Sequence, residues 1–240
     1  TSSIMIEFKD VHKKYGKLEV LKGVSFTIKD GGIFAILGPN GSGKTTSMKS
    51  FLGMVIPTKG DIFFNGKSIK NQWAYREQIS YLPQIANFPS NLKVKELIAM
   101  IKNIKKLPCH EQELIELFGL QKHLNKSLGN LSGGTKQKVN LVLTFMVDVP
   151  VLVLDEPTSG LDPIAILALK KLILREKEKG KTILITSHIL SFIEELSDEI
   201  LFILEGNIYF SGTPQQLLET TQKNNFQEAI AELLKNEKYD

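Results

Sequence analysis

The eight residues GPNGSGKT, from Gly38 to Thr45, match the phosphate-binding pattern G-x-x-x-x-G-K-[ST] in full. They follow the apolar run GIFAIL and open a predicted helix, which is the strand–loop–helix setting that the pattern requires. In such a loop the backbone amides surround phosphate oxygens, Lys44 reaches the terminal phosphates, and the Thr45 hydroxyl ligates Mg²⁺. The setting favours this interpretation over a tight glycine-rich turn without a ligand. The residues predicted to bind the phosphates of a nucleotide are Gly38, Pro39, Asn40, Gly41, Ser42, Gly43, Lys44, Thr45 and Thr46.

Two carboxylates follow a second apolar run, in VLVLDEP, and supply what a phosphate-transfer site needs besides the loop. Asp155, at the end of a predicted buried strand, is placed to hold the metal through water. Glu156 is expected to point the other way from the strand end, where it can orient or deprotonate an attacking water. An exposed acidic pair without a function is the alternative, and the complete phosphate loop disfavours it.

Three further side chains are candidates because of where they stand in the sequence. His188 ends the apolar run in TILITSH, and ligands of parallel sheets bind at strand ends, so it is placed to hydrogen-bond the terminal phosphate. Gln84, in YLPQ, stands at the entrance to a helical segment. Tyr15, in KKYG, either stacks on an adenine ring or is the aromatic residue of a turn, and the sequence leaves both open.

The stretch LSGGTKQ, residues 131–137, predicts a second anion site. Ser132 is a suitable N-cap for the helix that follows, and the free backbone amides of a helix start attract anions. One chain would therefore carry two phosphate sites, because the loop ending at Thr45 already provides one.

The hydrophobic pattern indicates the elements that must position these residues. Alternating apolar and polar residues in IMIEFKDV and EVLKGVSFTI predict strands of a partly exposed antiparallel sheet. Continuous apolar runs predict buried parallel strands, each followed by a helix, at 32–37, 151–156 and 182–187. The helix after the second of these has Asp162 as its cap, Pro163 at its first position and Gly180 at its end.

Between the first two parallel strands the pattern becomes helical. Residues 92–147 show helical periodicity without a clear strand, which predicts an inserted helical subdomain bounded near Gln84 and Pro150. Two short strands, EILFIL and NIYFSG, follow later and turn at residues 205–207. The last segment, NNFQEAIAELLKNEKYD, predicts a helix that starts at Asn225 and docks on the domain or, alternatively, on a partner.

The composition bounds the class of protein. The 240 residues, 42% of them apolar, suffice for one large domain, and no apolar run has the length of a membrane span. The first residues lack the pattern of a signal peptide, and the single cysteine, Cys109, fits a reducing compartment. The net charge is +4, but only two of the 30 basic residues are arginine and the lysines alternate with acids, so we expect no nucleic-acid partner.

The sequence resembles the ATP-binding subunit of an ABC transporter, from residue 4 to about residue 220. The elements that carry the resemblance are, in chain order, Tyr15, GPNGSGKT, Gln84, LSGGTKQ, VLVLDEP, SGLD and His188. It implies an α/β fold, a P-loop NTPase with a RecA-like core, an antiparallel β subdomain and an inserted helical subdomain. It also implies a single ABC ATPase domain over 1–240, with the core and β subdomain at 1–84 and 150–220, the helical signature subdomain at 85–149 and a C-terminal helix at 221–240.

The resemblance further implies that two such domains pack head to tail and enclose two ATP molecules, which accounts for the second phosphate site. Ser132, Gly133 and Gly134 would contact the γ-phosphate held by the partner, and Asp162 would lie along the seam. The catalytic residues implied are Glu156, His188 and Gln84, and the ligands implied for Mg²⁺ are Thr45, Gln84 and Asp155. The chain departs from the usual signature at Thr135, where glutamine is common, and at Lys138, where arginine is common.

Separate transmembrane permease subunits are implied as partners, with this chain on the cytoplasmic, inner face of the membrane. A homodimer, or a pair with a similar ATPase subunit, is expected. Within residues 84–91, Ile85 and Phe88 are apolar enough to contact the permease, and local packing under the helical insert is the alternative. Import and export remain open.

The sequence disfavours two other functions. A soluble relative in DNA repair or translation usually carries zinc sites, long coiled-coil inserts or two fused ATPase domains, none of which the sequence indicates. A regulatory module that binds ATP without hydrolysing it is disfavoured by Glu156 and His188.

Overall fold

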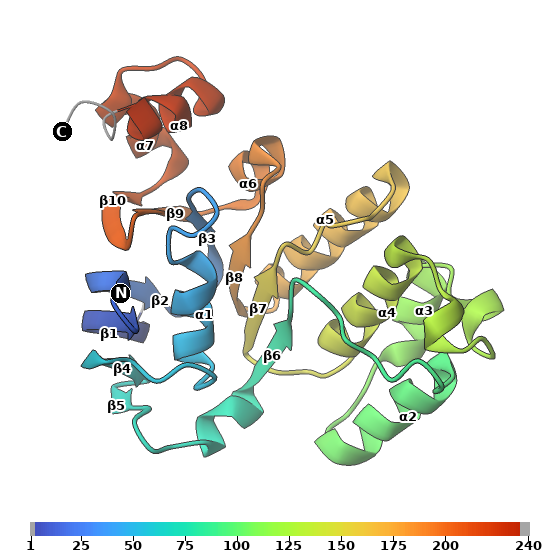
Figure 1. The fold of residues 1–240 in the computed structure, drawn as a ribbon. Coiled ribbons are helices and arrows are strands. Elements are labelled where there is room, and N and C mark those ends of the chain that lie inside the picture. The colour runs from blue at the N-terminus through green and yellow to red at the C-terminus, as the bar shows by residue number, and fades with distance from the viewer. Residues whose placement is uncertain (1–2, 236–240) are drawn as a thin grey trace.

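The structure is a computed structural model that describes residues 3–235. It contains two β-sheets, and the helices lie between them or on the side of the larger sheet (Figure 1). An antiparallel sheet has the strand order β2-β1-β4-β5, and a larger sheet has the order β10-β9-β3-β8-β7-β6. The strands are β1 Ile4–Tyr15, β2 Leu18–Lys29, β3 Gly32–Leu37, β4 Lys59–Phe64, β5 Lys67–Ser68, β6 Ile79–Leu82, β7 Val151–Asp155, β8 Thr182–Thr186, β9 Glu199–Leu204 and β10 Asn207–Gly212.

The six-stranded sheet carries the edge at which the predicted site residues meet. Strands β9, β3, β8, β7 and β6 run parallel, and β10 pairs antiparallel with β9. Every residue of β7 and β8 is buried, as the continuous apolar runs require for strands covered on both faces. The predicted parallel strands and the α/β class are therefore confirmed, and their carboxyl ends share one edge.

Helix α1, Lys44–Phe51, joins the two sheets. Its Met48 and Phe51 side chains lie in one buried cluster with Phe8 of the antiparallel sheet and Val153 of the parallel sheet. The Tyr75 hydroxyl donates a hydrogen bond of 2.7 Å to the Phe51 carbonyl and so fixes the end of this helix. Because α1 is held on both sides, the phosphate loop at its N-terminus has a rigid base.

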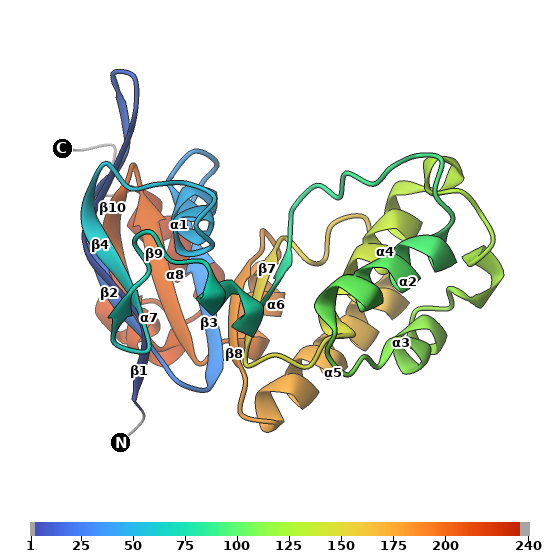
Figure 2. The ribbon, with the colours of Figure 1, turned by 90° about the horizontal axis from the view of Figure 1, so that it is seen from below.

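A group of three helices lies between β6 and β7 in the chain, and Figure 2 shows it on the side away from the antiparallel sheet. The helices are α2 Val94–Lys105, α3 Glu111–Leu117 and α4 Gly133–Phe145. Their apolar faces share a buried hydrophobic cluster with β7. The cluster includes Leu97 of α2, Leu114 of α3, Val142 of α4 and Leu152 of β7. The predicted helical periodicity of this segment is confirmed.

The helices of the C-terminal half cover the parallel sheet. The predicted N-cap and C-terminal end of α5 are confirmed. The Asp162 carboxylate accepts the Ala165 N–H at 2.9 Å, and Gly180 follows the last turn with φ of 83°. These helices are α5 Pro163–Glu178, α6 Leu190–Leu196, α7 Pro214–Thr221 and α8 Phe226–Lys235.

The predicted C-terminal helix at 221–240 is partly wrong in its bounds. Thr221, where the predicted helix starts, is the last residue of α7, a helix that the sequence pattern does not predict. The last helix begins at Phe226. Asn225 caps it, since its side chain accepts the Glu228 N–H at 2.9 Å. Phe226 and its neighbours on one face are buried against α6 and α7, so the helix docks on the domain, and positions 236–240 lie outside the described residues.

Candidate functional site

The phosphate loop connects β3 to α1 at the carboxyl edge of the parallel sheet. Gly38 has φ of 148°, and a Cβ atom there would lie 2.0 Å from the Ile203 carbonyl oxygen of β9, so only glycine fits. The Ser42 hydroxyl is buried and has no hydrogen-bond partner among residues 3–235. Buried polar groups are normally paired, so this hydroxyl fits a ligand oxygen at the start of α1.

Lys44 is buried at the first turn of α1. Its ammonium donates hydrogen bonds to the carbonyls of Gly38 and Pro39, the second at 3.0 Å, so it is folded back onto its own loop. Burial lowers the pKa of Lys44, and the charges of Glu156 and Asp155 partly offset that shift. A poorly solvated cation beside free backbone amides is a strong attraction for a polyphosphate.

Asp155 is held at both of its carboxylate oxygens. The Thr186 hydroxyl donates to Oδ1 at 2.6 Å, and the Thr45 hydroxyl donates to Oδ2 at 3.4 Å. The hydroxyls of Thr45 and Thr186 and the Asp155 carboxylate, from α1, β8 and β7, thus converge at one buried point. Burial and the nearby Asp155 charge also raise the pKa of Tyr81 to about 12, so this phenol stays neutral.

Glu156 follows Asp155 but does not continue the strand. Its φ of 53° is in the left-handed region, which costs a non-glycine residue about 1–3 kcal/mol. Its carboxylate accepts the His188 N–H at 3.2 Å and lies 3.2 Å from the His188 Nε2 atom. Burial raises the pKa of Glu156, against the opposing effect of His188.

The expectation that Glu156 points away from Asp155 is wrong. Side chains alternate along a regular strand, but the left-handed backbone at Glu156 turns its carboxylate into the same pocket. This pocket has a volume of about 100 Å³. Its lining residues are Val20, Asn40, Gly41, Gly43, Lys44, Thr45, Thr46, Gln84, Asp155, Glu156 and His188.

The pocket thus brings together the phosphate loop, Asp155, Glu156, Gln84 and His188, all of which were predicted from the sequence. Val20, on β2, was missed, because a valine in an alternating strand carries no signal of a site. Tyr15 and the signature residues at 132–134 are not among the lining residues.

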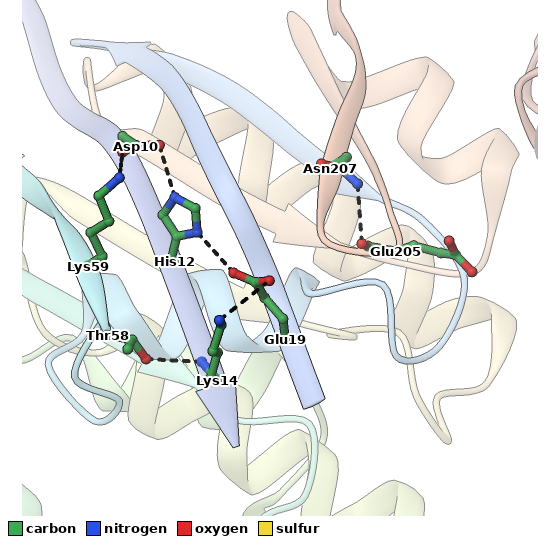
Figure 3. A network of polar contacts seen from close by, with 8 residues as sticks. All are labelled: Asp10, His12, Lys14, Glu19, Thr58, Lys59, Glu205 and Asn207. Atoms are coloured by element: carbon green, nitrogen blue, oxygen red, sulfur yellow. Dashed lines mark hydrogen bonds and ion pairs between the residues drawn. The ribbon is translucent and has the colours of Figure 1, made fainter. Parts of the chain in front are cut away.

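Tyr15 stands at the end of β1, in the hairpin that β1 forms with β2. Its side chain is 49% exposed, and the Lys13 ammonium lies 4.9 Å from the centre of its ring. Further down the same hairpin, the His12 ring contacts the carboxylates of Asp10 and Glu19, each at 3.0 Å (Figure 3). These two contacts raise the pKa of His12, with Glu19 the larger cause. The hairpin that carries Tyr15 is therefore fixed across both strands.

The signature residues begin α4. The Ser132 hydroxyl caps the helix by accepting the Thr135 N–H at 3.2 Å, and the Thr135 hydroxyl lies 2.8 Å away. A Cβ atom at Gly133 would meet nothing within 4 Å, whereas one at Gly134 would lie 2.6 Å from the Gly160 carbonyl. Gly134 is thus required by this chain's own packing, and Gly133 is not.

Asp162 joins the start of α5 to α4. Besides capping α5, it pairs with Lys138, whose Nζ atom lies 3.2 Å from Oδ2. The backbone and Lys138 hydrogen bonds lower the pKa of Asp162, so its negative charge is stabilised at the surface. The ion pair of Asp162 with Lys138 therefore connects the segment SGLD to the signature helix at the surface.

A phosphate loop on a parallel sheet, with two carboxylates at the next strand end, defines a P-loop nucleotide-binding protein. The family model described as ABC transporter matches residues 21–159. Among its relatives is the Nod factor export ATP-binding protein I of Burkholderia orbicola, 34% identical over 90% of this chain and 73% of the relative. Another is the lantibiotic transport ATP-binding protein SrtF of Streptococcus pyogenes, 36% identical over 85% of this chain and 89% of the relative.

A solved structure of an ATP-binding subunit of an ABC transporter superposes with a TM-score of 0.88 at 30% identity, covering 96% of this chain and 99% of that chain. The chain therefore belongs to the ABC transporter family. It is an ATP-binding subunit with the ATPase activity that drives transport, which the relatives favour over a role in DNA repair or translation. Between residues 3 and 235, no helix combines the length and the apolar character needed to cross a membrane.

Proposed function

We propose that this chain hydrolyses Mg²⁺-bound ATP within a head-to-tail pair of ATPase subunits, and that closure of the pair drives separate transmembrane subunits. The observation that carries the proposal is the separation of two phosphate-binding features. The pocket holds the phosphate loop, Asp155 and Glu156, yet Ser132 and Gly133 are exposed and do not line it. Each chain then has one complete phosphate loop and one half-site, the start of α4 at Ser132 and Gly133, which would bind a phosphate only on a second subunit.

The donor set at the pocket fits Mg²⁺, which prefers oxygen ligands. Thr45 would hold the ion directly, with Asp155 and Gln84 completing the set, since all three line the pocket. When bound, Mg²⁺ would neutralise charge on the β- and γ-phosphates. The Ser42 hydroxyl, which has no hydrogen-bond partner among the described residues, would bind a phosphate oxygen. The Lys44 ammonium would exchange the Gly38 and Pro39 carbonyls for phosphate oxygens.

Glu156 would orient and deprotonate the attacking water. Its buried Oε1 atom lies 3.2 Å from His188 Nε2 and accepts no hydrogen bond from residues 3–235, so this oxygen can accept one from a water in the pocket. The burial that raises its pKa also makes it a stronger base. His188, with a side chain 56% exposed and 3.2 Å from Glu156, would contact the γ-phosphate.

In the pair, the Ser132 hydroxyl and the amides of Gly133 and Gly134 would bind the γ-phosphate on the partner's loop. The N-terminus of α4 adds attraction for that anion. Asp162 would lie along the seam beside them. The partner is a second copy of this chain or a similar ATPase subunit.

The test is the substitution Ser132→Arg, which fills the half-site and leaves the phosphate loop untouched. We expect ATP binding by the monomer to persist, and ATP-driven dimerisation in a Glu156→Gln background to be lost in size-exclusion chromatography with light scattering. Thr213→Arg is the matched control, because Thr213 caps α7 in the same way, accepting the Gln216 N–H at 3.1 Å. Dimerisation of the Ser132→Arg protein at the control's ATP concentration would contradict the proposal.

The transmembrane partner is proposed to contact residues 84–91. Phe88 packs against the buried cluster of the helical group, which supports the alternative of local packing for this residue. Ile85 is 72% exposed and stays the candidate contact. An exporter role is supported by the export named for the Burkholderia relative. With separate transmembrane subunits as partners, the chain would lie peripherally on the inner face of the membrane. Loss of co-purification with the permease on Ile85→Asp is the expected result.

A further inference from the structure

Thr186, the last residue of β8, lies beside Asp155 in the parallel pairing of β7 with β8. Its side chain is completely buried, so it cannot touch a bound nucleotide. The rest of β8, before Thr186, is apolar apart from Thr182 at its other end. A buried hydroxyl in such a strand is costly unless its hydrogen bonds are satisfied. What Thr186 bonds to therefore indicates why a polar residue stands there.

The Thr186 hydroxyl connects the two carboxylate residues of the pocket. It accepts the backbone N–H of Glu156 at 3.0 Å and donates to Oδ1 of Asp155 at 2.6 Å. The direction of both bonds is fixed, because a backbone N–H only donates and a carboxylate only accepts. The same N–H also reaches the Thr186 carbonyl at 3.2 Å. One residue thus anchors both Asp155 and Glu156.

These bonds have two consequences for the pocket. With Oδ1 occupied, the Asp155 carboxylate is fixed so that Oδ2 faces the Thr45 hydroxyl. With its N–H anchored twice, Glu156 is held in the left-handed conformation that turns its carboxylate into the pocket. Valine, which has nearly the same shape as threonine, would keep the carbonyl contact to the Glu156 N–H but would lose both hydrogen bonds of the hydroxyl.

We propose that Thr186 is a positioning residue for ATP hydrolysis, whose hydroxyl aims Asp155 at the Mg²⁺ site and fixes the backbone of Glu156. The inference rests on the proposed roles of Asp155 and Glu156. It adds a residue that contacts neither nucleotide nor metal and acts through these two carboxylates.

The experiment compares Thr186→Val, which removes the hydroxyl at nearly constant shape, with Thr186→Ser, which keeps it. Thr186→Ala removes the same hydroxyl with a smaller side chain and guards against misfolding of the valine variant. Thr182→Val is the matched control, because Thr182 is equally buried in β8 but its hydroxyl accepts the Gly31 N–H at the far end of the strand. Thermal unfolding of each protein shows that it is folded.

Two readouts are measured on each folded protein: binding of a fluorescent ATP analogue across a Mg²⁺ titration, and steady-state ATP turnover. For Thr186→Val and Thr186→Ala we expect the half-saturating Mg²⁺ concentration to rise, and kcat to fall, by roughly 10–100-fold, as for other groups that orient a metal ligand. Analogue binding in EDTA should not change. Thr186→Ser should stay within about threefold of the original protein, and Thr182→Val should keep its Mg²⁺ dependence.

The outcomes separate the two proposals. Unchanged Mg²⁺ dependence in Thr186→Val, or an equal loss in Thr186→Ser or Thr182→Val, overturns the positioning role. If the unsubstituted protein binds the analogue without any response to Mg²⁺, the proposed metal role of Asp155 fails instead.

Discussion

Thr45 Oγ1 lies 3.4 Å from Asp155 Oδ2, although 110 residues separate the two in the sequence. The hydroxyl stands at the start of α1 and the carboxylate at the end of β7, so the contact joins the phosphate loop to the neighbouring part of the sheet. Both side chains line the pocket, and both are oxygen donors. This contact is where the proposed Mg²⁺ would be inserted.

Removal of the Thr45 hydroxyl should therefore weaken the response to Mg²⁺. We expect Thr45→Val to raise the Mg²⁺ concentration for half-maximal ATP turnover by at least about tenfold, whereas Thr45→Ser keeps the ligand and stays near the original value. The measurement is phosphate release across a Mg²⁺ titration at saturating ATP. Equal behaviour of the valine and serine variants would show that the hydroxyl is not a metal ligand.

Glu156→Gln should lower kcat by about 10²–10⁴-fold, because it removes the proposed base while keeping the shape of the side chain. Binding of ATP should persist, since the phosphate loop is unchanged. A turnover rate close to that of the original protein would rule out Glu156 as the base.

The same substitution should change stability in a pH-dependent way. Burial raises the pKa of Glu156 above its unfolded value, so the folded protein holds the carboxylate at a cost at neutral pH. That cost disappears as the pH falls through the folded pKa and is absent below the unfolded pKa. We expect Glu156→Gln to raise the melting temperature at pH 7 and to lose this advantage below pH of about 4.

The two signature glycines should respond differently to alanine. At Gly134 the new methyl group would meet the Gly160 carbonyl at 2.6 Å, so Gly134→Ala should lower the free energy of unfolding by about 1–3 kcal/mol. At Gly133 the methyl group meets open space, so Gly133→Ala should unfold like the original protein. If Gly133 contacts the partner's ATP, the same variant should still lose ATP-driven dimerisation. A Gly133→Ala protein that dimerises normally would remove that residue from the proposed interface.

Much of this site could be predicted because strong local patterns specify it. The loop ending at Thr45 has a complete motif, the buried strands β3, β7 and β8 are continuous apolar runs, and α5 has both a cap and a terminating glycine. The strand β6 was missed because it has only four residues, ISYL, and lies close to a proline. Short strands depend on their neighbours in the sheet more than on their own pattern.

The parts that could not be predicted depend on three-dimensional contacts. The left-handed backbone of Glu156 has no glycine or asparagine to indicate it, and it persists because Thr186 anchors its N–H. Thr186 itself is a β-branched residue in a strand, which is unremarkable in a sequence. The sequence signal that could have indicated Thr186 is its position two residues before His188. Phe88 looked too apolar for a loop, and the packing against the helical group explains it.

A buried ion pair fixes the chain where it returns from the helical group to the sheet. The Lys181 ammonium lies 2.5 Å from the Glu176 carboxylate on α5 and 2.8 Å from Asp148, which precedes β7. Lys181 and Glu176 are both buried, and the Lys179 ammonium adds a contact of 2.8 Å to Glu176. Although burial alone would raise the pKa of Glu176, the hydrogen bonds from Lys179 and Lys181 outweigh it and lower the pKa.

Lys181→Met should therefore destabilise the fold by about 1.5–3 kcal/mol at pH 7, because it removes the buried one of the two lysines that bond the Glu176 carboxylate and leaves the more exposed Lys179. The stability that a lowered carboxyl pKa contributes is present above the unfolded pKa and is lost as the pH falls through the folded pKa. The deficit of the variant should thus shrink in urea unfolding at a pH near the ordinary glutamate value of 4.5 or below. Lys170→Met is the control, since Lys170 pairs with the exposed Glu195 and such a surface pair is worth about 0–1 kcal/mol. Equal losses in the two variants, or a deficit that does not depend on pH, would show that the buried pair does not stabilise this junction.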